Sequence, residues 1–121
     1  MKQCLVVDDS EVIRKVARRI LESLNFEITE AENGQEALER CQANPPDAIL
    51  LDWSMPVMGG CEFLGALRFA KLEKKPFVLY CTTENDPIDI SKAIAAGADE
   101  YVLKPYNREV LESKLSEAGL A

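Results

Sequence analysis

Five side chains suited to phosphoryl chemistry stand just after apolar runs of the sequence. In chain order they are Asp8, Asp9, Asp52, Thr82 and Lys104. In an open parallel sheet, ligands bind outside the carboxyl ends of the strands, so we expect these side chains to converge at one edge. Three carboxylates at close range repel one another and favour a divalent cation between them. Oxygen ligands alone favour Mg²⁺ or a similar hard ion, which keeps waters and accepts phosphate oxygens.

A cation with an ammonium and a hydroxyl beside it meets the needs of phosphoryl transfer. Lys104 would balance the charge of the phosphoryl group, and the Thr82 hydroxyl would donate to one of its oxygens. A carboxylate that keeps a free oxygen can act as the nucleophile and become an acyl phosphate. Taken one at a time, such residues are more often turn residues, helix caps or solvated surface groups. Their shared position after strands favours the phosphoryl-transfer interpretation.

Short apolar runs alternate with helical patterns along the chain. The runs predict five strands, at residues 4–7, 26–31, 48–51, 77–81 and 101–103. Helices are predicted over residues 61–72 and after caps at Ser10, Asn33, Asp86 and Asn107. Residues 48–51 are apolar at every position, as expected of a strand covered on both faces. Five βα units therefore predict an α/β fold, a doubly wound parallel sheet with helices on both sides.

Composition excludes several functional classes. The chain has 121 residues, which suits one compact domain and leaves no room for an output domain. Fourteen Lys and Arg against 21 Asp and Glu give a net charge of −7, which makes nucleic acid a poor candidate ligand. No apolar run approaches the roughly 20 residues of a membrane span, and the N-terminus lacks a signal-peptide pattern. These features predict a cytoplasmic protein without membrane contact.

The cysteines indicate a structural rather than a metal-binding role. Cys4, Cys41, Cys61 and Cys81 lie far apart, and the sequence has neither a CxxC pair nor a histidine to complete a zinc site. We predict that all four are small core residues with free thiols in a reducing compartment.

The sequence around the candidate site resembles the receiver domains of two-component response regulators, especially the single-domain chemotaxis type. The resemblance covers nearly the whole chain and is carried by VVDDS at residues 6–10, PDAILLDWSMP at 46–56, Met58, Gly60, Thr82 and YVLKPY at 101–106. The spacing agrees as well, because Thr82 lies 30 positions after Asp52 and 22 before Lys104. The resemblance implies a flavodoxin-like fold with five strands in the order 2-1-3-4-5.

The resemblance also implies which residues hold the phosphoryl group and its metal ion. Asp52 would be the phosphoacceptor. Asp9 and Asp52 would bind Mg²⁺ directly, together with the backbone carbonyl of Ser54, and Asp8 would act through a water molecule. The phosphoryl donor would be a histidine kinase or a histidine phosphotransferase.

Further residues would respond to phosphorylation. By the resemblance, Thr82 and Lys104 would contact the phosphoryl oxygens, and Tyr101 would move between an exposed and a buried rotamer. Ser54 and Glu84 occupy the two positions that tune the lifetime of the phosphoryl group. The face that changes would be the fourth helix, fifth strand and fifth helix of a monomer. It would bind an output protein, such as a flagellar switch, a relay phosphotransferase or a kinase.

Two other functions would use the same residues. A Mg²⁺-dependent phosphatase or phosphotransferase acting on outside substrates would also form an aspartyl phosphate. Against it, the sequence has no evident lid, and Ser54 stands where such enzymes carry a second acidic residue. A phosphorylation-independent adaptor usually lacks one of the acidic residues or the lysine, and all of them are present here. We therefore expect a signalling phosphoacceptor rather than an enzyme with an external substrate.

Overall fold

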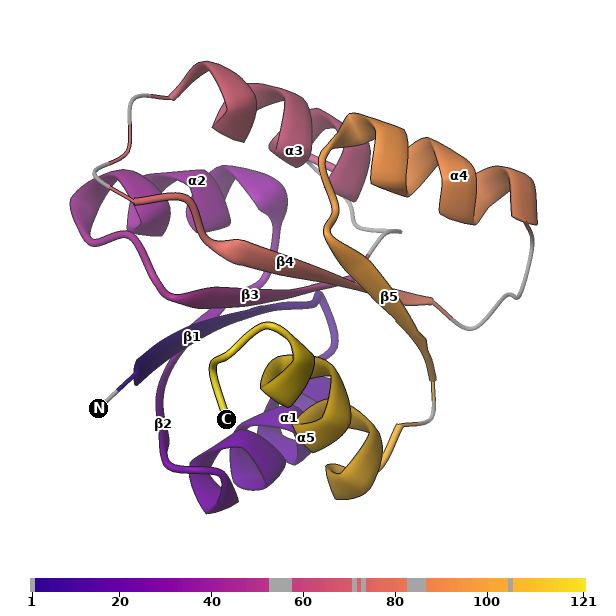
Figure 1. Cartoon of the computed structure of the whole chain (residues 1–121). Helices are drawn as coiled ribbons and strands as arrows, with labels where there is room; N and C mark the ends of the chain where they lie inside the picture. Colours follow the sequence, from indigo (N-terminus) through magenta and orange to yellow (C-terminus); the bar gives the residue numbers. More distant parts are fainter. Residues whose placement is uncertain (1, 53–57, 71, 73, 83–86, 105) are drawn as a thin grey trace.

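Five parallel strands form one sheet in this computed structural model, which describes residues 2–52, 58–70, 72, 74–82, 87–104 and 106–121 (Figure 1). The strands are β1 (Lys2–Val7), β2 (Phe26–Ala31), β3 (Ala48–Asp52), β4 (Phe77–Thr82) and β5 (Glu100–Leu103). The helices are α1 (Glu11–Ser23), α2 (Gly34–Ala43), α3 (Gly60–Phe69), α4 (Pro87–Ala96) and α5 (Arg108–Glu117). The strand order is β2-β1-β3-β4-β5, and every neighbouring pair is parallel. The predicted α/β fold and its strand order are confirmed.

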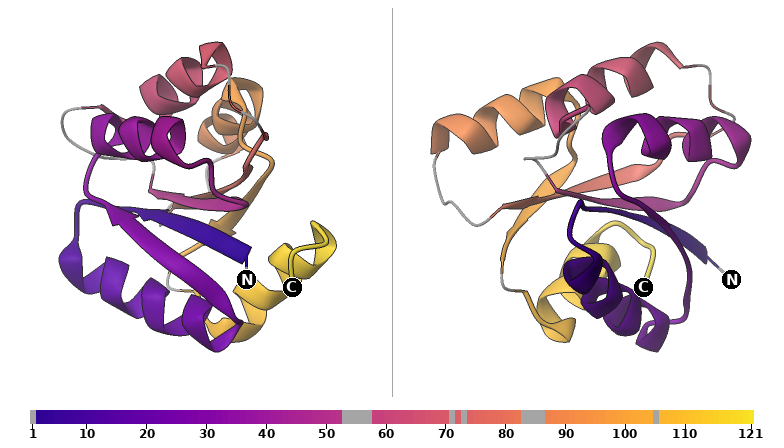
Figure 2. Two further views of the ribbon diagram at one scale, coloured as in Figure 1. Left: turned by 90° about the vertical axis from the view of Figure 1, so that its left-hand side faces the viewer. Right: turned by 180° about the vertical axis from the view of Figure 1, so that it is seen from behind.

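The helices cover both faces of the sheet. Figures 1 and 2 show α1 and α5 on one face and α2, α3 and α4 on the other. Alternate side chains of the central strands therefore enter two separate cores. In β1, Cys4 and Val6 join the core under α1 and α5, whereas Leu5 and Val7 join the core under the other three helices. Burial on both sides explains why the central strands are apolar at consecutive positions.

Three helices begin at a capping side chain. Ser10, Asn33 and Asn107 each accept a hydrogen bond from the backbone N–H three residues on, at 3.3, 2.8 and 2.9 Å. These predicted caps are confirmed, because each satisfies a donor that the first helical turn leaves unpaired. Helix α4 begins at Pro87, the predicted first helical position, and its predicted cap Asp86 lies outside the described residues.

Helix α3 is shorter than the sequence pattern predicts. It ends at Phe69 rather than at residue 72, because Ala70 adopts an extended conformation with ψ of 135°. The chain turns there, and Leu72 packs against the core under α2, α3 and α4. Helical periodicity cannot predict a turn that depends on packing in three dimensions. Within the described residues, no helix is long and apolar enough to cross a membrane.

One cysteine departs from the prediction that all four are core residues. Cys4, Cys41 and Cys81 are buried with free thiols, but Cys61 is exposed at the second position of α3. The prediction is wrong for Cys61 because the inward side of this helix is occupied by residues such as Phe63, which is fully buried. Burial raises the pKa of the Cys4 thiol to about 12 and that of the Cys41 thiol to about 11.

Two aspartates accept hydrogen bonds from backbone N–H groups at the N-terminal ends of the strands. Oδ2 of Asp47 accepts from the backbone N–H of Gln3 at 2.7 Å, and its Oδ1 accepts from Lys74 Nζ at 2.9 Å. Both bonds hold the pKa of the Asp47 carboxyl below its ordinary value. Oδ2 of Asp99 accepts from the backbone N–H of Val78 at 2.8 Å. These bonds tie β1 to the residue before β3, and β4 to the residue before β5.

Strand β2 forms an edge of the sheet, and two arginines cover its outward carbonyls. The Ala31 carbonyl faces β1, so the carbonyls of Ile28 and Glu30 point away from the sheet. Arg18 Nη2 donates to the carbonyl of Ile28 at 3.0 Å, and Arg40 Nε donates to the carbonyl of Glu30 at 2.6 Å. Charged side chains on an edge strand hinder its pairing with a strand of another molecule.

Candidate functional site

Three carboxylates meet at the C-terminal edge of the sheet. Strands β1 and β3 are neighbours with Val7 paired to Leu51, so the residues that follow these two arrive at the same level. Asp8, Asp9 and Asp52 place carboxylate oxygens that all lie within 4.8 Å of one another. Asp8 is only 4% exposed, whereas Asp9 is exposed and leaves the cluster open to solvent. The structure thus brings together the three acidic residues that the sequence placed after strands.

Asp8 is held through all of its polar atoms. Its N–H donates to the Ala31 carbonyl at 3.1 Å, and its own carbonyl accepts from Arg14 Nη1 at 2.8 Å. Its Oδ1 accepts from the Ser10 N–H at 2.9 Å, and its Oδ2 accepts from Lys104 Nζ at 3.0 Å. A buried carboxylate needs such partners, because burial without them strongly disfavours its charge. Asp8 is therefore a fixed part of the site.

Lys104 bridges two of the carboxylates. Its Nζ lies 3.0 Å from Oδ2 of Asp8 and 3.0 Å from Oδ1 of Asp52. Its backbone N–H donates to the Thr82 carbonyl at 2.7 Å, which fixes the end of β5 against the end of β4. Burial disfavours the charge of Lys104, but its hydrogen bonds to both carboxylates outweigh this and raise its pKa. A stable cation is thus held beside Asp52.

The single positive charge of Lys104 does not balance the burial of Asp52 and its two acidic neighbours. Burial raises the pKa of its carboxyl, the bond to Lys104 opposes that rise, and the charges of Asp8 and Asp9 add to it. The net direction is upward, so one lysine does not offset this environment. A divalent cation fits the donor set, which consists of oxygen ligands with excess negative charge and one side open to solvent. The residues present therefore fit Mg²⁺.

Thr82 and Tyr101 lie on the strands next to this cluster. Thr82 is the last residue of β4, half-buried and paired with Leu103. The preceding residue, Cys81, pairs with Asp52, so Thr82 ends its strand one residue beyond the level of Asp52. Tyr101 lies on β5, half-buried, and packs against the core under α2, α3 and α4. Thr82 therefore stands at the edge that carries the carboxylates, and Tyr101 lies farther back along the neighbouring strand.

Two residues of the expected site lie outside the part of the chain that the structure describes. They are Ser54, expected to offer its carbonyl to the metal, and Glu84, expected to tune the phosphoryl lifetime. The described chain resumes after β3 at Met58, whose carbonyl accepts from the Gly34 N–H at 2.9 Å. A Cβ on Gly34 would lie 2.5 Å from that carbonyl oxygen. Glycine at the start of α2 thus permits a close backbone contact with the segment that follows the site.

Arg14 and Glu30 belong to the surroundings of the site and were missed by sequence reasoning. Arg14 joins the Asp8 carbonyl to Glu30, whose Oε1 accepts from Arg14 Nε at 3.0 Å. The alternation of buried and exposed residues along β2 indicates that Glu30 needs a partner. Phe26, Ile28 and Glu30 share one face of this strand, and the first two are buried in the core under α1. A carboxylate on that face needs a partner from α1.

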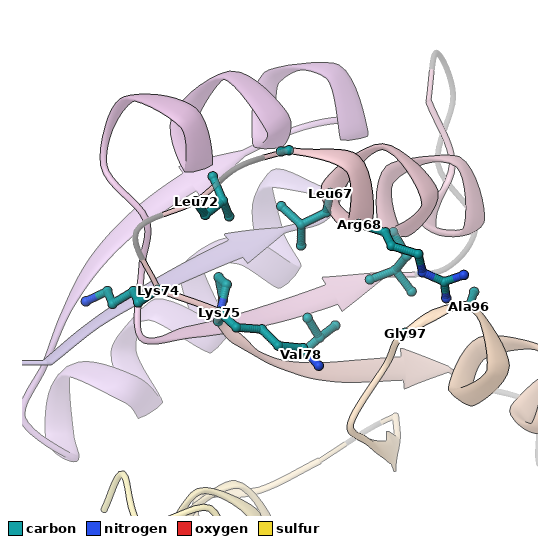
Figure 3. A pocket seen from close by; sticks show the side chains of 11 residues that line it. Leu67, Arg68, Leu72, Lys74, Lys75, Val78, Ala96 and Gly97 are labelled. Atoms are coloured by element: carbon teal, nitrogen blue, oxygen red, sulfur yellow. The ribbon is translucent and has the colours of Figure 1, made fainter.

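A cavity of about 310 Å³ lies at the opposite end of the sheet (Figure 3). Its lining includes the apolar side chains of Leu67, Leu72 and Val78 and the exposed cations Arg68 and Lys75. None of its described lining residues is acidic. The cavity therefore lacks the ligands that a divalent cation needs and is separate from the carboxylate cluster.

Both sequence and fold are similar to known proteins. The sequence model of the response regulator receiver domain matches residues 4–116. The chemotaxis protein CheY1 of Helicobacter pylori is 36% identical over 113 residues, which cover 92% of this chain and 91% of that protein. A solved structure of the chemotaxis protein CheY4 of Vibrio cholerae has a TM-score of 0.90 at 37% identity, covering 97% of this chain and 98% of that one. The receiver domain of a Pseudomonas aeruginosa sensor histidine kinase, solved with a magnesium ion coordinated in its active-site cleft, has a TM-score of 0.88 at 26% identity, covering 96% and 95%.

Proposed function

The chain belongs to the response regulator receiver domain family as a CheY-like member, and from this membership we propose that Asp52 is its phosphoacceptor. CheY-like receiver domains act in two-component signalling. In the proposed site, Asp9 and Asp52 would hold Mg²⁺ directly together with the backbone carbonyl of Ser54, and Asp8 would act through water. Bound Mg²⁺ would neutralise part of the charge of the transferring phosphoryl group.

The observation that carries this proposal is the cluster of three carboxylates with Lys104 across two of them. The hydrogen bonds support different roles for Asp8 and Asp52. Both carboxylate oxygens of Asp8 have protein partners, which suits a structural carboxylate. Asp52 uses Oδ1 for Lys104, and among the described residues no donor reaches its Oδ2. Asp52 therefore keeps the free oxygen that a nucleophile needs.

The chain's own residues support a simple transfer step. An oxygen of the Asp52 carboxylate attacks the phosphorus of a phosphohistidine. The new O–P bond forms as the N–P bond breaks, and the departing imidazole keeps the electron pair and takes a proton from water. Lys104 and the Thr82 hydroxyl then contact phosphoryl oxygens. The product is an acyl phosphate, which carries about −1.5 to −2 charge at the end of β3 where the carboxylate carried a single negative charge.

The proposed output is a change on the face formed by α4, β5 and α5. Thr82 moves toward the phosphoryl group, and the space it leaves admits the Tyr101 side chain. Large apolar side chains already stand exposed on these elements: Ile88, Ile94, Leu103 and Val110. A partner that prefers the changed face shifts the population toward it. We propose that the donor is a histidine kinase or histidine phosphotransferase, and that the partner is an output protein such as a flagellar switch, a relay phosphotransferase or a kinase.

Intact-mass spectrometry tests this function. With a small phosphodonor and Mg²⁺, the chain should gain the mass of one phosphoryl group, and EDTA or the substitution Asp52→Asn should abolish the gain. Asp99→Asn is a matched control, because it neutralises an aspartate at the opposite end of the sheet, keeps an oxygen that can accept from the Val78 N–H, and should be phosphorylated like the wild type. An unmodified wild-type chain, or a modification that survives in Asp52→Asn, contradicts the proposal.

The same samples discriminate the two other functions. Steady turnover of an aryl phosphate that is lost in Asp52→Asn would indicate an enzyme with an external substrate. A chain that neither binds Mg²⁺ nor accepts a phosphoryl group would indicate an adaptor. The intact set of carboxylates with Lys104 favours the phosphoacceptor over both.

A further inference from the structure

We infer that Arg14 is a positioning residue for the metal ligands: its guanidinium fixes the backbone that carries Asp9, and Glu30 fixes the guanidinium. The inference rests on the proposed function, because it concerns the same cation site. It adds two residues that touch neither the ion nor the phosphoryl group and yet determine where the Asp9 carboxylate stands.

Asp9 depends on its backbone for its position. Its side chain is exposed, and no hydrogen bond or ion pair reaches its carboxylate from the described residues. The carbonyl of Asp8 belongs to the planar peptide group that leads into Asp9. A bond from Arg14 to that carbonyl therefore fixes the orientation of the peptide group. A ligand that is already in place loses less conformational freedom when the ion binds.

Arg14 reaches its two partners with different nitrogens. Nη1 donates to the Asp8 carbonyl at 2.8 Å, and Nε donates to Oε1 of Glu30 at 3.0 Å. The side chains of Arg14 and Glu30 are each 14% exposed, so both bonds are largely shielded from water. A planar guanidinium holds its donors in a fixed arrangement that the single ammonium of lysine cannot reproduce. Arg14 thus links the Asp8 carbonyl rigidly to β2.

Glu30 is held in turn by three basic side chains of α1. It accepts from Arg14 Nε at 3.0 Å, from Lys15 Nζ at 2.9 Å and from Arg18 Nη1 at 2.7 Å. Burial disfavours the charge of Glu30, but hydrogen bonds from Lys15 and Arg14 and the charge of Arg18 hold the pKa of its carboxyl below the ordinary value. Glu30 therefore stays ionised, and Arg14 keeps its partner at neutral pH.

Arg18 provides a matched comparison within the same network. Like Arg14, it lies on α1, pairs with Glu30 and donates to a backbone carbonyl. Its carbonyl partner is Ile28 in the middle of β2, whereas that of Arg14 is Asp8 beside the metal ligands. Replacing Arg18 removes the same charge and the same kind of ion pair but leaves the Asp8 carbonyl untouched.

Positioning and charge predict opposite effects of losing Arg14. If Arg14 acted only through its charge, then removing a cation near the carboxylates would strengthen the binding of Mg²⁺. If it positions the Asp8–Asp9 peptide, removing it weakens the binding of Mg²⁺. Arg14→Lys separates the two further, because it keeps the charge and loses the two-sided geometry of the guanidinium.

Titration of the full chain with Mg²⁺ tests the inference, with calorimetry or with fluorescence of Trp53, the single tryptophan. Arg14→Lys and Arg14→Gln should each weaken Mg²⁺ binding by about tenfold or more, the usual effect of losing a residue that orients a metal ligand. Arg18→Gln should lose much less Mg²⁺ affinity than Arg14→Gln, because Arg14 and Lys15 still pair with Glu30 and the bond to the Asp8 carbonyl remains. Saturating Mg²⁺ should restore the phosphorylation rate of the Arg14 variants, because the reacting groups are unchanged.

The outcomes separate this inference from the proposed function. A wild-type chain that does not bind Mg²⁺ defeats both. A wild-type chain that binds it, with Arg14→Lys equal to wild type or Arg14→Gln tighter, defeats the inference alone. Thermal melts show beforehand whether each variant folds. If the Arg14 variants do not fold, Glu30→Gln decides the matter, since it keeps Arg14 and weakens its hold, and unchanged Mg²⁺ affinity in that variant also defeats the inference.

Discussion

Replacing Asp52 by asparagine should stabilise the metal-free protein while it abolishes phosphorylation. In the folded chain, Asp52 lies within 4.8 Å of oxygens of Asp8 and Asp9, and 3.0 Å from Lys104 Nζ. Burial, opposed by Lys104 and reinforced by the two acidic neighbours, raises the pKa of Asp52. A raised pKa in the folded state means that the charge of Asp52 disfavours folding. The substitution removes that charge and keeps the shape of the side chain.

Coulomb's law gives the size of the effect. At an effective dielectric constant of about 20, like charges at 4.8 Å, the outer limit of the separations in the cluster, repel by roughly 3.5 kcal/mol, so two acidic neighbours cost at least roughly 7 kcal/mol. On the same scale, the attraction to Lys104 at 3.0 Å offsets roughly 5.5 kcal/mol. The difference of roughly 1–2 kcal/mol, together with the cost of burying the charge, is the stability that Asp52→Asn should gain.

Urea denaturation in EDTA, followed by circular dichroism, measures this gain. Divided by a slope of about 1–3 kcal/mol per molar urea, this gain should raise the midpoint of the variant by roughly 0.3–2 M. Excess Mg²⁺ should reverse the order, because binding adds about 2.7 kcal/mol at a hundredfold excess over Kd and the variant would lack one of the proposed ligands. Asp47→Asn is a control of opposite sign. The pKa of Asp47 is lowered by bonds from Gln3 and Lys74, so losing its charge should destabilise the chain.

The pH dependence of the gain has a definite sign. Because the folded pKa of Asp52 is raised, the penalty is present above that pKa and disappears below the unfolded value of about 4. The advantage of Asp52→Asn over the wild type should therefore shrink as the pH falls from about 7 toward about 4. A variant less stable than the wild type in EDTA at neutral pH would show that Lys104 outweighs the repulsion, and would refute this reasoning.

Three other predictions concern the scaffold. Gly34→Ala should destabilise the chain by about 1–3 kcal/mol, because its Cβ would meet the Met58 carbonyl. Gly65→Ala has open space around its Cβ and should raise the free energy of unfolding by up to about 1 kcal/mol. Urea titrations measure both changes. The reverse order would contradict the contact. In the folded protein, a thiol reagent should label Cys61 alone, and more than one label by intact mass would show that the buried thiols are accessible. Removing the two arginines that cover β2, in a double alanine variant, should promote self-association in sedimentation experiments, and a variant that stays as monomeric as the wild type would count against their covering role.

Local sequence features predicted the helices and strands because caps and hydrophobic periodicity involve only residues close together in the chain. The caps at Ser10, Asn33 and Asn107 were visible as residue types three positions before a helix turn, and each makes the expected bond. The strand order is different, because periodicity does not say on which side of a strand its successor will lie. That order came from the motifs of the family resemblance, and the structure confirms it.

The acidic cluster was predictable, and the residues that support it were not recognised. Asp8 and Lys104 follow strands and Asp52 ends one, and the carboxyl ends of parallel strands lie at one edge, so their meeting follows from the fold. Arg14 makes its contribution through a backbone carbonyl, which leaves no motif in the sequence. Cys61 was misplaced because an apolar segment does not show which of its residues faces outward.

The hydrogen bonds that Asp47 and Asp99 make at the N-terminal ends of the strands have a consequence for the site at the other end. Central strands with two apolar faces could slip by one residue without exposing a polar face, so hydrophobicity alone does not set their alignment. The side chain of Asp47 accepts a hydrogen bond from the Gln3 N–H on β1, and its backbone carbonyl accepts one from the Phe77 N–H on β4. A slip of one residue would move Asp52 by about 3.3 Å and turn its side chain to the opposite face of the sheet. The accuracy with which the carboxylates are brought together is therefore determined a full strand length away from them.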